Sequence, residues 1–164
     1  MRWRTEDGFT LIEVVIAMTI LSIGILGIAG LAGTAAKNSG YSQSMSLANN
    51  LSQEKLEALL SVDYNNIQVT DTTAPRADLR RNCTQTSASV SRPVYSCTPV
   101  DATLTSGNKS FTWSYTVTYI DLSGNGVANP TLDGLKRIDV TVSWTDALWH
   151  ATKSVTLATM RTKG

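Results

Sequence analysis

The sequence predicts an α+β fold in which one long N-terminal helix packs by its second half on an antiparallel β-sheet. Three observations support this prediction. Residues 9–36 form an apolar segment, residues 37–61 continue it with an amphipathic pattern, and several later segments alternate apolar and polar residues as β-strands do. The predicted order along the chain is therefore a long helix, a connecting loop and a sheet.

The apolar segment is long enough to cross a membrane. From Val14 to Gly33 it has 20 residues without a charge, which as a helix reach across the ~30 Å hydrocarbon core of a bilayer. Glu13 lies at the start of this segment, between apolar residues on both sides. A carboxylate at mid-bilayer costs roughly 2.5–3.5 kcal/mol and less near the end of a span, so such an acid indicates function and needs a cationic partner.

The residues around this acid form a recognisable signal. A short charged leader ends at Gly8 and is followed by Phe9, the run Thr10-Leu11-Ile12-Glu13 and the apolar helix. This arrangement resembles the class III signal peptide of type IV pilins and pseudopilins. The resemblance implies that a prepilin peptidase cuts after Gly8, that Phe9 becomes an N-methylated N-terminus, and that Glu13 makes the assembly contact with the amine of a neighbouring subunit.

The resemblance, together with the sequence pattern, predicts the segments of the chain and its cellular location. We expect a leader peptide (1–8), a transmembrane and filament-core helix (9–36), an amphipathic continuation (37–61), an αβ-loop with a disulfide (62–105) and an antiparallel sheet domain (106–164). Arg2 and Arg4 favour a cytoplasmic N-terminus. The expected location is the bacterial inner membrane with a periplasmic C-terminal domain, and later the pilus tip.

Four glycines recur at every third position in the second half of the membrane segment. They are Gly24, Gly27, Gly30 and Gly33. At this spacing they spiral around the helix and do not form the close-packing face of a GxxxG motif. Each costs about 1 kcal/mol against alanine in an exposed helix. One interpretation is a segment that melts easily during assembly, and the other is the ordinary abundance of glycine in membrane helices.

The amphipathic segment predicts one buried helix face. The residues expected on that face are Tyr41, Met45, Ala48, Leu56 and Leu59. The residues expected opposite are Gln43, Ser46, Asn50, Gln53, Glu54 and Glu57. We expect the first set to cover the sheet and the second to face solvent.

Two cysteines lie in the segment that follows the helix. Cys83 and Cys97 are expected to form a disulfide in an oxidising periplasm. The surrounding residues 62–105 are rich in Ser, Thr and Pro and are interpreted as connecting structure. A metal or redox role is disfavoured because the segment has no CxxC motif and no nearby His.

Three later segments have the pattern of β-strands. Residues 110–120 and 137–145 alternate strictly, and residues 153–160 do so more weakly. The apolar side chains expected to face the helix are Phe111, Trp113, Tyr115, Val117 and Tyr119 in the first strand, Ile138, Val140, Val142 and Trp144 in the second, and Val155 and Leu157 in the third.

The turn after the first of these strands imitates the start of a calcium-binding loop. Asp121, Ser123 and Asn125 supply oxygen at alternate positions, but Leu132 stands where the loop needs a glutamate. Asn-Gly and Ser-Gly are also ordinary turn formers. Calcium is therefore a weak candidate, and we expect no other metal and no cofactor.

The function expected from the resemblance is assembly and not catalysis. With 164 residues, a net charge of +1, two Cys and one His, the chain has no evident set of catalytic residues. Residues 8–61 resemble the type IV pilus modification proteins, a family of minor pilins. This implies a subunit of a tip or priming complex whose partners are other minor pilins, the major pilin, prepilin peptidase, the inner-membrane assembly platform and a tip adhesin.

Two alternatives from related classes stay open. An I-type pseudopilin of a type II secretion system has the same N-terminal pattern. A DNA-uptake pilin is disfavoured by the near-neutral charge, because nucleic-acid-binding domains are usually basic; we expect no nucleic-acid partner.

Overall fold

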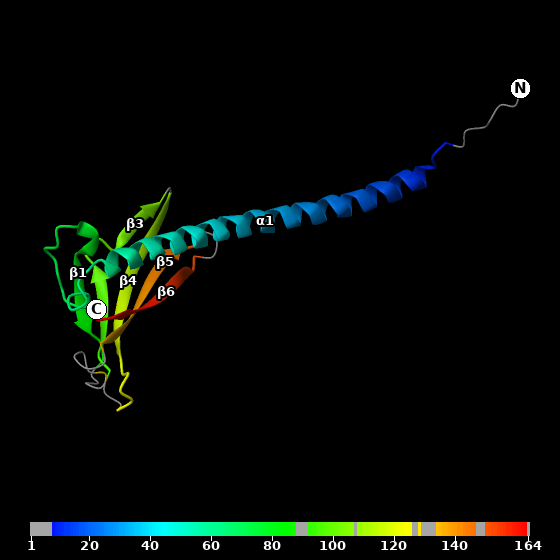
Figure 1. Ribbon diagram of the computed structural model, residues 1–164. Helices are drawn as coiled ribbons and strands as arrows, with labels where there is room; N and C mark the ends of the chain where they lie inside the picture. Colours follow the sequence, from blue (N-terminus) through cyan, green and yellow to red (C-terminus); the bar gives the residue numbers. More distant parts are fainter. Residues whose placement is uncertain are drawn as a thin grey trace, which may run out of the picture. The chain divides into compact units, whose positions relative to one another are not determined.

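The structure is a computed structural model that describes residues 8–87, 92–106, 108–125, 128, 134–146 and 150–163. Within them the chain forms α1 (Leu11–Leu60), the short 3-10 helix η1 (Ala77–Leu79) and the strands β1 (Arg81–Gln85), β2 (Val94–Pro99), β3 (Thr103–Ser106), β4 (Lys109–Ile120), β5 (Leu135–Thr145) and β6 (Thr152–Thr162) (Figure 1). This is the predicted α+β arrangement of one long N-terminal helix and an antiparallel sheet.

The chain has two compact units, Met1–Ser42 and Gln43–Gly164. In the first unit, α1 is long and apolar enough to cross a membrane. Its large apolar side chains lie on the surface of this chain, and Leu26 for example is 73% exposed. A helix that is apolar on all sides and uncovered is typical of a membrane span.

In the second unit, the last turns of α1 lie on one face of the sheet (Figure 1). The buried residues of this part are Ser44, Ala48, Ser52, Lys55, Ala58 and Leu59. Ala48 and Leu59 were expected there, and all six residues expected to face solvent are exposed.

Two residues of the expected stripe lie elsewhere. Tyr41 and Met45 are 38% and 42% exposed, and Leu56 is half-buried. Four of the six buried residues of this part of the helix are small, namely Ser44, Ala48, Ser52 and Ala58, and the large side chains of the core come mainly from the sheet. Ala48 therefore joins a cluster with Phe111 and Trp113.

The sheet is antiparallel, with strand order β1-β2-β4-β5-β6 and with β3 paired to β4. All nine apolar residues predicted to face the helix from β4 and β5 are buried. Their alternation places every second residue on the same face of the sheet. At the centre of the core, β4 and β5 are aligned so that Tyr115 lies opposite Val140 and Val117 lies opposite Ile138.

Residues 62–105 contain more structure than the connecting loop we expected. They form η1 and the strands β1, β2 and β3, so the sheet begins at Arg81 and not near residue 106. These strands are short, and β1 has the polar sequence RNCTQ with one buried residue, Arg81. The period-two pattern of apolar residues is therefore too weak to reveal them.

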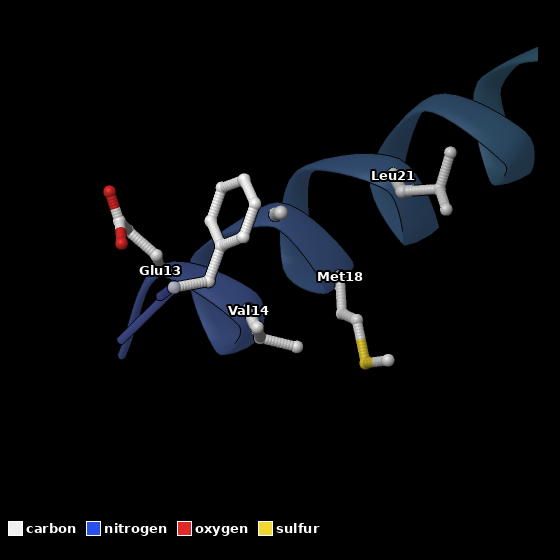
Figure 2. Close-up of a pocket in the computed structure, with 6 residues that line it drawn as sticks. Glu13, Val14, Met18 and Leu21 are labelled. Atoms are coloured by element: carbon white, nitrogen blue, oxygen red, sulfur yellow. The ribbon is translucent and has the colours of Figure 1, made fainter. Parts of the chain in front are cut away.

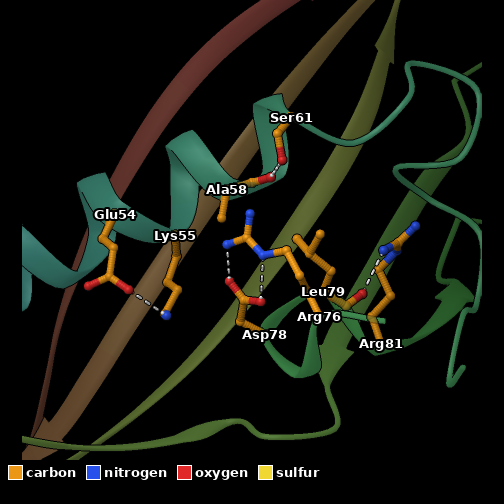
Figure 3. A network of polar contacts seen from close by, with 8 residues as sticks. All are labelled: Glu54, Lys55, Ala58, Ser61, Arg76, Asp78, Leu79 and Arg81. Atoms are coloured by element: carbon orange, nitrogen blue, oxygen red, sulfur yellow. Dashed lines mark hydrogen bonds and ion pairs between the residues drawn. The ribbon is translucent and has the colours of Figure 1, made fainter. Parts of the chain in front are cut away.

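A buried cation, Arg81, attaches the segment that follows α1 to the sheet. Arg81 of β1 donates to the carbonyl oxygens of Asn66, Val69 and Leu79 at 2.7, 3.1 and 2.6 Å. Figure 3 shows the contact with Leu79, and also the pairing of Lys55 Nζ with Glu54 at 2.8 Å on α1. Arg81 thus supplies donors to three backbone carbonyls of a partly buried segment, of which that of Asn66 also accepts from the Val69 amide at 3.0 Å.

Candidate functional site

The candidate assembly site lies at the start of α1, where Thr10 and Glu13 form a capping box. The Glu13 carboxylate accepts hydrogen bonds from the Thr10 amide at 3.1 Å and from the Thr10 hydroxyl at 3.0 Å. In return, the Glu13 amide donates to Thr10 Oγ1 at 3.4 Å. Thr10 is thus the N-cap and Glu13 the third residue of the helix, and each satisfies a polar group of the other.

The sequence analysis did not identify this role of Thr10. The signal is present, because Thr-x-x-Glu before an apolar run is the pattern of a capping box. The structure shows that the Glu13 carboxylate has donors within its own chain. A cation from another chain would therefore have to compete with Thr10 or share the carboxylate with it.

An open apolar hollow lies beside this acid on one face of the helix. It is lined by Phe9, Glu13, Val14, Ala17, Met18 and Leu21, and Figure 2 shows their side chains along the first turns of α1. Except for the Glu13 carboxylate, the lining is apolar. The hollow can therefore take apolar groups, such as acyl chains or the side chains of another helix, while the Glu13 carboxylate points away from Val14, Met18 and Leu21 (Figure 2).

The expected cleavage position lies just before the helix. Gly8 and Phe9 precede Leu11, the first helical residue, and Phe9 is 88% exposed. The leader residues 1–7 lie outside the described part of the chain. The peptide bond between Gly8 and Phe9 thus lies outside regular structure, and both of its residues are exposed. Its hydrolysis stays a prediction.

The four glycines of the membrane segment lie within α1 and make no close contacts. A Cβ atom at Gly24, Gly27, Gly30 or Gly33 would meet nothing within 4 Å. No contact within this chain therefore requires glycine there. The melting hypothesis remains a prediction.

The cysteines form a disulfide between neighbouring strands. Cys83 of β1 and Cys97 of β2 are directly opposed in the register, with their Cα atoms 4.1 Å apart. The bond joins two strands of the sheet, in the segment where we expected it to close a loop.

The turn after β4 has an ordinary explanation. Asp121 Oδ1 accepts hydrogen bonds from Ser123 Oγ and from the Gly124 amide, both at 2.9 Å, and Gly124 adopts a φ of 71°. Within the described residues, no three His, Cys, Asp or Glu residues are grouped as metal ligands. Part of the loop, including Leu132, lies outside those residues, and nothing in the described part adds support for calcium.

Lys136 is a buried cation that the sequence analysis did not single out. Its Nζ donates to the Tyr64 carbonyl at 2.5 Å and to Gln68 Oε1 at 2.8 Å. It also lies 3.8 Å and 4.9 Å from the ring centroids of Tyr64 and Tyr119. The sequence feature that could have predicted its burial is its position two residues before Ile138, which places both side chains on the inward-facing side of β5.

Burial changes the pKa values of Lys136 and of two core tyrosines. Burial lowers the pKa of Lys136 to about 8, and the charge of Arg161 acts in the same direction while Asp63 opposes it. Burial raises the pKa of Tyr119 to about 12 and also raises that of Tyr115. These groups lie in the core, and among the described residues no three His, Cys, Asp or Glu side chains are grouped near them as metal ligands.

Comparison with known proteins supports the interpretation of the N-terminus. The family model of the prokaryotic N-terminal methylation motif matches residues 3–29. No curated protein and no solved structure matches the chain. The motif, which marks structural subunits and not enzymes, supports a type IV pilin-like or pseudopilin protein, and the apolar helix fits a membrane-anchored one.

Proposed function

We propose that this chain is a minor pilin, a subunit of a tip or priming complex that initiates or modulates assembly of a type IV pilus. Among minor pilins it resembles the type IV pilus modification protein, PilV. The observation that carries the proposal is Glu13, an acid at the head of an apolar helix directly after Gly8-Phe9, inside a matched N-terminal methylation motif.

Cleavage after Gly8 would make the chemistry of assembly possible. It would convert the amide nitrogen of Phe9 into an amine at about the same membrane depth as Glu13. The bonds from Thr10 already go to a charged acceptor, but their donors are neutral. A protonated amine would add the attraction between two opposite charges to its hydrogen bond with the carboxylate. An incoming subunit could therefore displace or supplement Thr10 at the carboxylate of its neighbour, and apolar contacts at the adjacent hollow would support the joint.

The proposed partners follow from this route. A prepilin peptidase removes residues 1–8 and the new Phe9 is methylated. The inner-membrane assembly platform then receives the subunit, with its C-terminal domain in the periplasm. Other minor pilins, the major pilin and a tip adhesin are the proposed neighbours in the fibre.

The experiment combines N-terminal mass spectrometry with a matched pair of variants. The membrane form is expected to begin with N-methylated Phe9. Glu13→Ala should leave a processed protein that does not enter pili, whereas Glu57→Ala, which removes an exposed acid from the same helix, should be incorporated normally. Normal piliation and normal incorporation of Glu13→Ala would refute the proposal.

An I-type pseudopilin is the second candidate, because the methylation motif is shared by both systems. Deletion of the gene separates the two. Loss of surface pili with normal protein secretion supports the minor pilin, and loss of secretion with normal pili supports the pseudopilin.

A further inference from the structure

The two outer edges of the sheet differ in how their backbone groups are satisfied. At β1, Arg81 exchanges backbone hydrogen bonds with Asp71 at 2.8 and 2.9 Å. The hydroxyl of Thr70 donates to the Cys83 carbonyl at 3.1 Å and accepts from the Cys83 amide at 2.9 Å. The segment before η1 therefore covers this edge and prevents pairing with another strand at these positions.

The edge at β6 is open in the described part of the chain. β6 pairs with β5 from Thr152 to Thr162. Two bonds that flank the strand, from Lys163 N to Gly134 O at 2.8 Å and from Asp146 N to Ala151 O at 3.0 Å, show that odd-numbered residues bond toward β5.

In an antiparallel ladder the backbone groups point alternately to the two sides. The even-numbered residues of β6 therefore direct their amides and carbonyls away from β5. These residues are Thr152, Ser154, Thr156, Ala158, Met160 and Thr162. No backbone group among the described residues bonds to them, so an edge of 11 residues is available to another strand.

The charge of this edge argues against a second copy of the chain as the occupant. The only charged side chains from Thr152 to Lys163 are Lys153, Arg161 and Lys163 itself. Antiparallel pairing of two copies centred on Leu157 would place Lys153 directly opposite Arg161. Like charges opposite each other destabilise a strand pair, whereas opposite charges stabilise it.

The inward-facing side of β6 defines the rest of the partner. Val155 and Leu157 are half-buried there, and Val155 packs against the core. A strand added beyond β6 would extend this face and could cover both side chains with its own apolar residues. Affinity would come from main-chain hydrogen bonds and specificity from alternate side chains.

From these observations we infer that β6 is a docking edge where an extended segment of a different protein, apolar on one side and acidic at both ends, adds to the sheet. This inference goes beyond the proposed function, since it holds for a pilus subunit or a secretion subunit alike. It depends on the open edge and on its positive charge, and not on Glu13.

The test uses the full chain in detergent micelles and the peptide Glu-Thr-Val-Thr-Val-Thr-Val-Thr-Glu. Its two acids have the same separation as Lys153 and Arg161. Hydrogen exchange, measured residue by residue, is the readout. The peptide should slow exchange of the outward amides of Ser154, Thr156, Ala158 and Met160 about ten-fold or more, and leave the amides that face β5 unchanged. The same peptide with Lys in place of Glu should have little effect.

Two variants provide matched controls. Ala158→Pro removes an outward amide while keeping the bonds to β5, and proline is tolerated at such edge positions. It should abolish protection by the peptide, whereas Ala158→Val should retain it. Lys153→Glu should shift the preference from the Glu peptide toward the Lys peptide.

Several results would overturn the inference. Outward amides that already exchange slowly in the dilute free protein would show that the edge is covered. Protection that rises with protein concentration alone would identify a second copy as the occupant. No protection by the Glu peptide, or equal protection by both peptides, would exclude a docking edge of the proposed chemistry.

Discussion

Lys136 makes the stability of the sheet domain depend on pH in a direction that can be calculated. Its pKa is lowered from 10.5 to about 8 in the folded chain. Because the folded state binds this proton more weakly than the unfolded state, the charged lysine destabilises the fold below pH 8. That destabilisation is lost as the pH rises from about 8 to about 10.5.

The magnitude follows from the two pKa values. One pKa unit corresponds to about 1.4 kcal/mol, so the full shift is on the order of 3 kcal/mol. Integration over the range from about pH 7 to about pH 9 predicts a rise of roughly 1 kcal/mol in the free energy of unfolding. Tyrosines act in the opposite direction above about pH 10, because burial raises the pKa values of Tyr64, Tyr115 and Tyr119, so measurements should end near pH 9.

The assay is urea unfolding of the full chain in a mild detergent, followed by the fluorescence of the buried Trp113 and Trp144. The wild type should show the rise, and Lys136→Met should remove it. Lys153→Met, the same change on the neighbouring strand, should keep it. A pH-independent wild type, or a rise that persists in Lys136→Met, would refute the assignment of this effect to Lys136.

Three further predictions concern other parts of the chain. Replacing Cys83 and Cys97 by Ser should lower the free energy of unfolding by up to about 3 kcal/mol, measured by urea unfolding; no change, also after reduction of the wild type, would contradict a stabilising role for this bond. Ala48→Leu should cost about 1–3 kcal/mol, because Ala48 is 0% exposed in the core and a larger side chain overpacks it; exposed Ser46→Leu is the control, and equal effects of the two would argue against the close contact of helix and sheet. Replacing Gly24, Gly27, Gly30 and Gly33 together by alanine should raise the helicity of the chain in micelles, since each Gly costs about 1 kcal/mol. Under the melting hypothesis, the same change should reduce incorporation into filaments, and unchanged incorporation would eliminate that hypothesis.

The parts of the fold that were predictable are those with strong periodic patterns. The strict alternation of β4 and β5 identified their buried residues, and the unbroken apolar and amphipathic run identified α1, which extends from Leu11 to Leu60. The short strands β1 to β3 were missed because their side chains are mostly polar. Their pairing depends on β4 and on the covering contacts of Thr70 and Asp71, which are long-range features that local patterns do not contain.

The candidate site was predictable in its residues but not in its hydrogen bonding. Glu13 was identified from its charge in an apolar segment. Its hydrogen bonds with Thr10 follow from the geometry of a helix N-terminus. The sequence pattern Thr-x-x-Glu was interpreted as part of the signal peptide and not as a capping box. Lys136 was missed because a lysine in an alternating strand is normally assigned to solvent, and only the aromatic rings and carbonyls contributed by residues 64–68 and Tyr119 explain its burial.

The bonding of the Glu13 carboxylate to Thr10 has a consequence for the supply of subunits. A chain that enters a bilayer by this helix brings its own neutral donors, so it does not require a second molecule in order to reside there. Single copies can accumulate as a standing reservoir. Under the proposed function, such single copies become able to join a fibre only once proteolysis has freed the amino group of Phe9.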